Sequence, residues 1–292
     1  MPELPEVETM RGIVARELTG RELATANLTL PKLMRDSPLP DLNQLVGSTL
    51  VGTGRRAKVM VTHWSNHLSV LTHFKLAGQL TVVRPDGTRV MAGHPVPGPE
   101  GPLPHKSTHL TMTFTDGSLL YYSDIRQFGW WRLMPTDDVP AALDAFNFAA
   151  EGVGGERITL EDLGGKLARR RIPLKQALLD QTVVAGLGNI YVDEALHHAR
   201  LHPERPANSL SGAELLAIHD AIAWSLERGL EQGGADIRNH KAYPRDGFPA
   251  IHARKGETCT TCGTEILKIV VGTRGTYYCP VCQPPPTATV QG

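Results

Sequence analysis

The stretch CTTCGTEILKIVVGTRGTYYCPVC, which runs from Cys259 to Cys282, contains all four cysteines of the 292-residue chain. The spacing C-x2-C-x16-C-x2-C is typical of a zinc site with four thiolate ligands, because each pair brings two sulfur donors to one side of a tight turn. Two disulfide bonds or four unpaired thiols are the alternatives, and a reducing cytosol disfavours the disulfides. The spacing therefore predicts one structural Zn²⁺ on four thiolates, those of Cys259, Cys262, Cys279 and Cys282.

The residues between the two cysteine pairs have the pattern of a β-hairpin. Residues 266–271 and 276–278 are rich in β-branched and aromatic side chains, which favour strands. Residues 272–275, Gly-Thr-Arg-Gly, form the expected tip and present Arg274 on a loop. We expect zinc to stabilise this hairpin, because so small a segment does not fold on its own core.

Upstream of the cysteines the sequence predicts helices over residues 173–179, 190–199 and 212–232. The last of these begins with a capping box, in which Ser211 is followed three residues later by Glu214. Its apolar residues recur at helical spacing, which is more typical of a core-facing stripe than of a binding face.

The stretch QTVVAGLGNIY, residues 181–191, joins the first two of these helices. Its Gly-x-Gly is weak evidence for dinucleotide binding, because no strand precedes it. As part of a helix–turn–helix, it puts Gly188 and Asn189 at the start of the second helix. Free N–H groups at a helix N-terminus bind phosphate, so this turn is a candidate phosphate contact.

The segment from Lys166 to Lys175 carries five cations and no acid. Such a run suits contacts with phosphate, and a solvated linker is an equally acceptable interpretation. The cations are Lys166, Arg169, Arg170, Arg171 and Lys175.

The N-terminal half combines one helix with many short strands. A helix is expected from Pro5 to Leu18, followed by strands that include 58–64, 68–74, 108–115 and 118–124. Two Asp-Gly pairs, at 86–87 and 116–117, are hairpin turn signals. The pattern indicates an antiparallel sandwich or barrel, and residues 93–104 are expected to form a long loop.

Composition excludes several classes of protein. A hydrophobic fraction of 41% and a charged fraction of 21% are those of a folded chain, not of a disordered one. No apolar run approaches the ~20 residues of a membrane helix, and the acidic N-terminus does not resemble a secretory signal. We therefore expect no membrane association and a cytoplasmic location. The 30 basic and 30 acidic residues cancel, which indicates localised phosphate contacts in place of a uniformly basic surface.

The sequence MPELPE at the N-terminus offers one candidate nucleophile. Pro2 is small enough to permit removal of Met1, which would leave a secondary amine as the chain terminus. An α-amino group titrates near pH ~8, so part of it is neutral and nucleophilic at physiological pH. Glu3, next in the chain, could serve as general acid and base. Taken alone, these residues fit an ordinary terminus before a helix better.

Together the motifs are more specific than any one of them. MPELPEVET at residues 1–9, LLDQ at 178–181, VAGLGNIY at 184–191 and the four-cysteine finger closely resemble bacterial formamidopyrimidine-DNA glycosylases of the formamidopyrimidine-DNA glycosylase/endonuclease VIII family. The resemblance extends in order over nearly the whole chain. It implies an α+β fold: an antiparallel β-sandwich with an N-terminal helix, a helix–two-turn–helix domain and a zinc-finger hairpin. It also implies a bifunctional glycosylase/AP lyase that excises oxidised purines from duplex DNA.

The resemblance assigns roles by position. It makes Pro2 the Schiff-base nucleophile and Glu3 the proton donor to the sugar, assisted by Lys58 and Arg274. Base flipping and insertion of side chains into the stack explain the DNA contacts that it implies. Those contacts fall on Leu76, His109, Arg126, Phe128, Arg170, Arg171, Lys175 and Asn189.

Some positions depart from the family pattern. Lys75-Leu76 replaces the usual Gly-Met, and Ser107 replaces the first residue of a His-x-His pair whose second is His109. Residues 235–248 correspond to a loop that caps an extruded oxidised guanine, and the chain is several residues shorter there. These changes bear on lesion preference and leave the catalytic assignment intact.

The resemblance divides the chain into a catalytic sandwich (1–135), a linker (136–155), a helix–two-turn–helix domain (156–250), a finger (251–283) and a disordered tail (284–292). A monomer bound to double-stranded DNA with oxidised bases or abasic sites is expected. An endonuclease VIII-like enzyme for oxidised pyrimidines is one alternative. A non-catalytic zinc protein that binds damaged DNA is the other, and it would leave Pro2, Glu3 and Lys58 unexplained.

Overall fold

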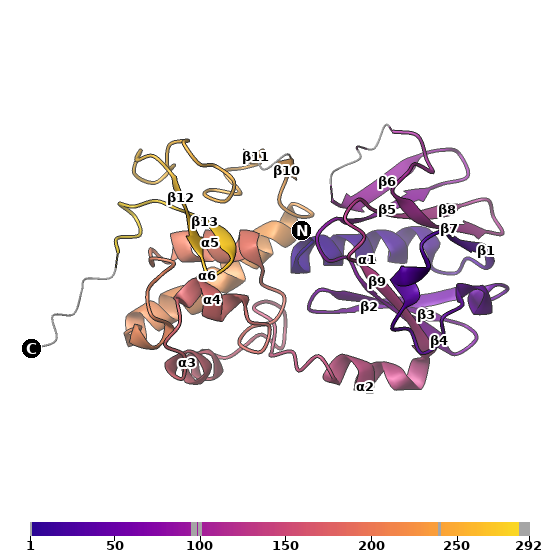
Figure 1. Cartoon of the computed structure of the whole chain (residues 1–292), viewed down its shortest axis with the longest axis horizontal. Helices are drawn as coiled ribbons and strands as arrows, with labels where there is room; N and C mark the ends of the chain where they lie inside the picture. The colour runs from indigo at the N-terminus through magenta and orange to yellow at the C-terminus, as the bar shows by residue number, and fades with distance from the viewer. Residues whose placement is uncertain (1, 95–97, 99–100, 239–240, 286–292) are drawn as a thin grey trace, which may run out of the picture. The chain divides into compact units, whose positions relative to one another are not determined.

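The computed structural model describes residues 2–94, 98, 101–238 and 241–285. The chain divides into two compact units, Met1–Phe146 and Asn147–Gly292, and each is described here by itself (Figure 1). The boundary falls inside the predicted linker, where η3 (Thr136–Asp138) and α2 (Val139–Asp144) form. The finer domain limits stay a prediction, and most of the predicted disordered tail lies outside the described residues.

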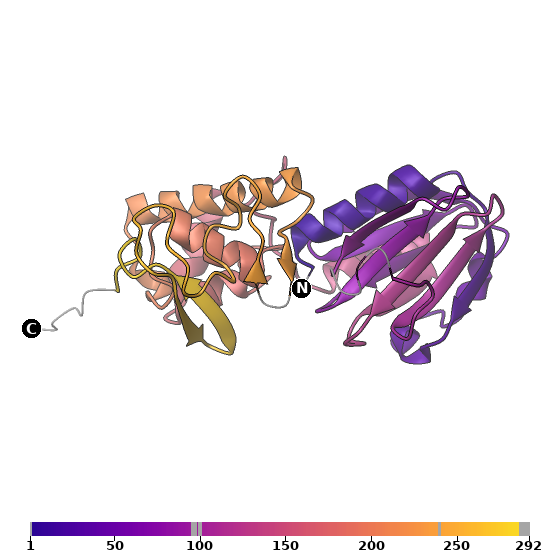
Figure 2. The same ribbon diagram turned by 90° about the horizontal axis from the view of Figure 1, so that it is seen from above.

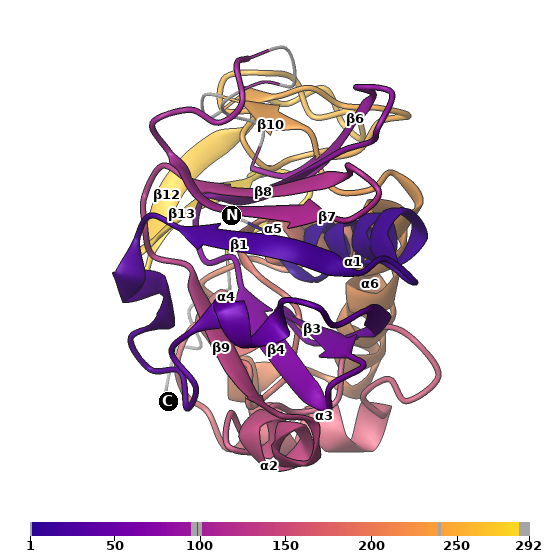
Figure 3. The same ribbon diagram turned by 90° about the vertical axis from the view of Figure 1, so that its right-hand side faces the viewer.

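The first unit is a sandwich of two antiparallel sheets, as predicted. Figure 3 shows the two layers face to face within this unit. One sheet has the order β1-β7-β8-β5-β6 and the other β2-β3-β4-β9. The strands are β1 (Leu23–Leu28), β2 (Leu50–Arg56), β3 (Val59–Trp64), β4 (Leu68–His73), β5 (Gly78–Val83), β6 (Arg89–Gly93), β7 (Thr108–Phe114), β8 (Leu119–Asp124) and β9 (Trp130–Pro135). Two short 3-10 turns, η1 (Pro31–Met34) and η2 (Leu42–Leu45), follow β1.

Helix α1 (Leu4–Leu18) covers one side of the sandwich. It packs along β6 and β2, which are edge strands of the two sheets (Figure 2). Its residues at helical spacing, Val7, Met10, Val14 and Leu18, are buried in the hydrophobic core of this unit. This burial holds α1 on the sandwich, and Glu3 is the N-cap residue at the start of the helix.

Both predicted Asp-Gly turns occur. Gly87 and Gly117 have φ values of +85° and +89°, in the left-handed region that glycine adopts at little cost. Asp116 accepts a hydrogen bond from the amide of Ser118 at 3.0 Å, which closes the turn between β7 and β8. The first turn joins β5 to β6 and the second joins β7 to β8, and each pair is antiparallel.

The second unit contains the predicted helices with small shifts in their ends. They are α3 (Leu160–Ala168), α4 (Leu174–Leu179), α5 (Asn189–His198) and α6 (Gly212–Glu231), with η4 (Ala207–Ser209) before α6. The capping box is present, since Ser211 and Glu214 bond reciprocally. Helix α3 was not predicted, because its two glycines interrupt the helical pattern. None of the helices in the described residues could span a membrane.

The finger contains the predicted hairpin, formed by β12 (Leu267–Val271) and β13 (Arg274–Tyr278). Two further short strands, β10 (Ile237–Arg238) and β11 (Lys241–Ala242), pair in the predicted capping segment. The predicted tip was too long, because Arg274 is already in β13 and pairs with Val271. Gly272, with φ +61°, permits a two-residue turn, which hairpins favour when φ is positive.

Candidate nucleic-acid interface and zinc site

The predicted nucleophile and its neighbour lie at the entry to α1. Pro2 and Glu3 are both buried, and the Glu3 side chain has no exposed surface. The Glu6 carboxylate accepts a hydrogen bond from the Glu3 amide at 2.8 Å, and Pro5 occupies the first turn, where proline is tolerated. Helix capping thus holds this pair in a fixed orientation. Removal of Met1 lies outside the described residues.

Lys58 lies in the turn between β2 and β3. The strand predicted to begin at this residue begins one residue later, at Val59. Its side chain is buried, and the preceding Ala57 has a positive φ of 51°. Burial, with the charges of Lys75 and Lys58, lowers the pKa of His73 to about 3. His73 is therefore neutral at pH 7, and its Nδ1 accepts a hydrogen bond from the Lys75 amide at 3.0 Å.

A tight loop after β8 carries two of the predicted DNA contacts. Asp124 accepts hydrogen bonds from the amides of Arg126 at 3.0 Å and Gly129 at 2.8 Å. Between them the Arg126 and Phe128 side chains are exposed, with the guanidinium carbon 5.5 Å from the ring centroid. The loop therefore presents a cation and an aromatic ring together, and their insertion into a base stack stays a prediction.

Two other predicted contacts of this unit are less exposed. Leu76 is half-buried in the loop between β4 and β5. His109 is buried, and its Nε2 lies 3.0 Å from the carbonyl oxygen of Asp124, to which it must donate. His109 thus supports the Asp124 loop, and its direct contact with DNA stays a prediction.

In the second unit, Asn189 is the first residue of α5, after Gly188 at the N-cap. Its Nδ2 donates to the carbonyl oxygen of Gly275 in the hairpin at 3.0 Å. Its buried Oδ1 has no hydrogen-bond partner in the described part of the chain. A buried acceptor of this kind is a feature of sites that a ligand completes.

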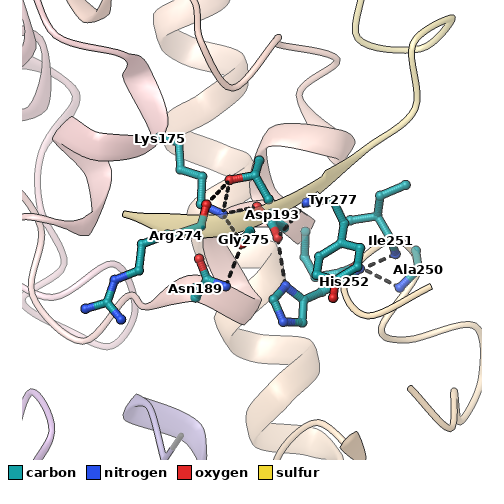
Figure 4. Close-up of polar contacts among 11 residues, drawn as sticks. Lys175, Asn189, Asp193, Ala250, Ile251, His252, Arg274, Gly275 and Tyr277 are labelled. Atoms are coloured by element: carbon teal, nitrogen blue, oxygen red, sulfur yellow. Dashed lines mark hydrogen bonds and ion pairs between the residues drawn. The ribbon is translucent and has the colours of Figure 1, made fainter. Parts of the chain in front are cut away.

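The predicted contact Lys175 is fully buried. Its ammonium donates to Asp193 at 2.7 Å, Thr276 Oγ1 at 2.8 Å and the Gly275 carbonyl at 3.1 Å (Figure 4). The arrangement joins α4, α5 and β13. The direct DNA contact of Lys175 stays a prediction, whereas its bonds within the protein are well defined.

The remaining predicted cations differ in exposure. Arg274 is exposed, and its guanidinium extends away from the buried contacts (Figure 4). Arg171 is exposed as well. Arg170 is half-buried and donates to Asp180 at 3.0 Å. Arg274 and Arg171 are therefore the more accessible cations for phosphate.

Sequence reasoning missed three residues that organise these loops, Asp124, Asp193 and His252. Asp193 lies four residues after Asn189, so one helical turn separates them, and that spacing could have indicated it. His252 carries no local signal, because its partner Asp193 is 59 residues away in the chain.

The four cysteines meet as predicted. Their sulfur atoms lie within 4.8 Å of one another, with Cys259–Cys282 at 3.9 Å and Cys262–Cys279 at 3.4 Å. A tetrahedron with Zn–S bonds of ~2.3 Å has sulfur–sulfur edges of about 3.8 Å, so the cluster fits one ion. The four thiolates would hold Zn²⁺ in a closed, structural site.

The β-sandwich, the helix–turn–helix and the four-cysteine site together define a two-unit protein of the zinc-finger class. Three family models match it in order. They are the formamidopyrimidine-DNA glycosylase N-terminal domain over residues 1–131, the formamidopyrimidine-DNA glycosylase H2TH domain over 150–241, and the zinc finger found in FPG and IleRS over 256–285.

Relatives match over nearly the whole length. The formamidopyrimidine-DNA glycosylase of Lactococcus lactis subsp. cremoris is 35% identical, over 97% of this chain and 99% of its own. That of Roseiflexus sp. (strain RS-1) is 37% identical, over 97% and 100%. A solved complex of Lactococcus lactis Fpg with DNA containing an abasic site matches with a TM-score of 0.84 at 32% identity, over 97% of this chain and 100% of that one. The chain belongs to the formamidopyrimidine-DNA glycosylase family.

Proposed function

We propose that the chain is a bifunctional DNA glycosylase and abasic-site lyase of base excision repair that excises oxidised purines, 8-oxoguanine and formamidopyrimidines, from duplex DNA. Similarity over nearly the full length to formamidopyrimidine-DNA glycosylases supports the substrate class. The observation that carries the mechanism is the placement of Pro2 and the fully buried Glu3 at the entry to α1.

The chemistry follows from a secondary amine at Pro2 once Met1 is removed. Its nitrogen forms a bond to C1′ of the damaged nucleotide, and the base leaves with a proton. Protonation of O4′ lets the C1′–O4′ bond break, which opens the sugar ring and gives an iminium. This iminium accepts electrons when the C2′ proton is lost and the 3′ phosphate departs. A second elimination expels the 5′ phosphate, and hydrolysis frees the amine. Glu3 carries protons to and from the sugar, and Lys58 assists.

The proposed DNA contacts come from both units. Asn189 and Arg274 hold the phosphates around the flipped nucleotide, and Arg274 assists the second elimination. Arg126 and Phe128 fill the space that the flipped nucleotide leaves, with Leu76 as a third wedge. When bound, zinc stabilises the finger that carries Arg274 and takes no part in the reaction.

Solved structures of relatives support DNA as the partner: one is a complex of a Lactococcus lactis Fpg mutant with DNA containing Fapy-dG, with a TM-score of 0.83 at 34% identity. For this chain the partner is double-stranded DNA with oxidised bases or abasic sites. A monomer is the simplest state for it, and work on a bacterial chromosome implies a cytoplasmic location.

Borohydride trapping tests the proposal. The Met1-processed protein is mixed with a duplex that holds one 8-oxoguanine opposite cytosine, and borohydride reduces the iminium. We expect a covalent protein–DNA band that is lost in Pro2→Gly, while binding to damaged DNA persists. Full activity of Pro2→Gly contradicts the amine mechanism.

Two further substrates separate the alternatives. A band with thymine glycol and none with 8-oxoguanine supports an endonuclease VIII-like specificity for oxidised pyrimidines. No band with 8-oxoguanine, thymine glycol or an abasic site supports a protein that binds damage without cleaving it.

A further inference from the structure

A buried chain of polar contacts runs from His252 to the hairpin that carries Arg274. At its centre Asp193 accepts hydrogen bonds on both carboxylate oxygens, from Lys175 Nζ and from His252 Nδ1, each at 2.7 Å (Figure 4). The Lys175 and Asp193 side chains have no exposed surface, and that of His252 is 10% exposed. These contacts lie beside the proposed DNA-binding residues, yet solvent scarcely reaches them.

His252 is held in place from two sides. Its amide donates to the buried Glu194 at 2.8 Å, which also accepts the amides of Ala250 and Ile251. Its ring lies edge-on to Tyr277, with centroids 4.9 Å apart. Because a carboxylate only accepts hydrogen bonds, His252 Nδ1 must carry the proton toward Asp193.

Lys175 transmits this orientation to β13. The same ammonium donates to Thr276 Oγ1, which in turn donates to the Arg274 carbonyl at 3.0 Å. It also shares the Gly275 carbonyl with Asn189 Nδ2, at 3.1 and 3.0 Å respectively. The backbone at Arg274 and the Asn189 amide therefore depend on one buried cation.

We propose that His252 is a positioning residue for DNA cleavage. It fixes the Asp193 carboxylate, Asp193 fixes Lys175, and Lys175 sets the hairpin backbone from which Arg274 acts. Without the His252 donor, the amide of Tyr277, at 3.2 Å, is the one donor left to Oδ2 of Asp193 among the described residues, and the carboxylate can rotate. This inference rests on the proposed function, in which Arg274 assists the second elimination.

Two substitutions that place a side-chain N–H differently can show whether His252 acts through its hydrogen bond to Asp193 or only by filling space. In His252→Asn the side-chain amide nitrogen can replace Nδ1, whereas in His252→Gln the longer side chain brings its amide nitrogen to the place of Nε2 instead. We therefore compare the two variants on an abasic-site duplex, and measure the trapped complex and the ratio of 3′-aldehyde to 3′-phosphate ends. The aldehyde reports the first elimination alone, and the phosphate reports both.

We expect His252→Gln to trap within about twofold of wild type, because Pro2 is untouched, but to leave at least threefold more 3′-aldehyde. His252→Asn is expected to restore the wild-type ratio. A wild-type ratio in folded His252→Gln overturns the inference, and so does an equal defect in His252→Asn. Failure of the wild-type protein to trap at all contradicts the proposed function instead.

Two more variants keep the test decisive. Thr276→Val removes a Lys175 acceptor and the bond to Arg274 without altering His252, so a folded Thr276→Val with a wild-type ratio also overturns the inference.

His219 is a matched control: it is buried in the same unit, with Nδ1 3.0 Å from Asp220 and Nε2 2.9 Å from the Ile158 carbonyl. His219→Gln is expected to keep the wild-type ratio, and a raised ratio there overturns the inference. Zinc content and circular dichroism establish that each variant is folded.

Discussion

The Asp124 carboxylate accepts a hydrogen bond from the Gly129 amide at 2.8 Å and so closes the loop between β8 and β9. The same carboxylate also accepts from the Arg126 amide and from the Tyr122 hydroxyl, at 3.0 and 3.3 Å. A fully buried acceptor with three donors holds the loop in one conformation. Phe128 lies in this loop and is 54% exposed, so hydrogen bonds at the base of the loop hold an exposed aromatic ring in place.

Gly129→Ala tests this support. A Cβ at position 129 would overlap the Tyr122 hydroxyl oxygen and lie 3.1 Å from Asp124 Oδ2. Because the loop must shift to admit it, we expect the free energy of unfolding to fall by about 1–3 kcal/mol. We also expect weaker binding to abasic-site DNA, since Phe128 moves with the loop. Denaturant unfolding and fluorescence anisotropy measure the two effects.

Gly12→Ala is the matched control. Gly12 lies in α1, and a Cβ there meets nothing within 4 Å. Alanine in a helix is favoured over glycine by about 1 kcal/mol, so this variant should be slightly more stable and bind DNA normally. Equal stability of Gly129→Ala and wild type would contradict the proposed role of the loop.

The adjacent cations Arg170 and Arg171 are predicted to differ in their effect on DNA binding. Arg171 is exposed, whereas Arg170 is half-buried and bonded to Asp180 and the Lys166 carbonyl. If Arg171 neutralises one phosphate, Arg171→Ala lowers the slope of log affinity against log salt by about 0.9. Arg170→Ala should change the slope less.

Affinity for an abasic-site duplex, measured at several salt concentrations, checks this difference. The two variants remove the same charge from neighbouring positions, so each is the other's control. Equal slopes for both would show that exposure does not decide which cation contacts phosphate.

The sequence predicted local features well and the contacts between distant residues poorly. The helix at 5–18 and the Asp-Gly turns follow from patterns a few residues long, which local physics decides. Arg274 was placed on a loop although it begins β13, because hairpin turn length depends on strand pairing.

The candidate site shows the same division. The four cysteines were found by spacing alone, and the structure brings them together. Pro2 and Glu3 were candidates on chemical grounds, but taken alone they fit an ordinary terminus better, so their roles were assigned only through the resemblance. Burial of Lys175 could not be predicted, because its partners Asp193 and Thr276 are 18 and 101 residues away and turn an apparent surface cation into a buried one.

Removal of zinc is expected to weaken DNA binding without unfolding the sandwich. Only the second unit contains the cysteines, and Cys259 and Cys279 belong to the small core of the finger. Without metal that core loses the crosslink on which it depends, so β13 and Arg274 lose their support. We expect at least tenfold weaker binding to abasic-site DNA after chelation or in Cys262→Ser.

Zinc content, anisotropy and near-ultraviolet circular dichroism measure this effect, and re-addition of zinc to the chelated protein is the control. Unchanged affinity in protein shown to lack zinc would contradict a supporting role for the metal.

Glu17 and Arg84 predict a specific response of the first unit to acid. The Arg84 guanidinium bonds to both oxygens of the buried Glu17 carboxylate, at 2.7 and 2.9 Å, and Arg16 Nε donates to it at 2.8 Å. These contacts, that of Arg84 foremost, lower the pKa of Glu17 from 4.5 to about 2. A carboxyl whose pKa is lower in the folded state stabilises that state above its unfolded pKa. The stabilisation is lost as the pH falls from about 4.5 toward about 2.

Glu17→Gln should therefore be less stable than wild type at pH 6, with the difference shrinking toward pH 2.5. Urea unfolding at several pH values measures this difference in stability. In the Arg84→Ala background, the added substitution Glu17→Gln should change the free energy of unfolding much less. A gap between Glu17→Gln and wild type that stays constant with pH would show that the ionised pair does not stabilise the sandwich.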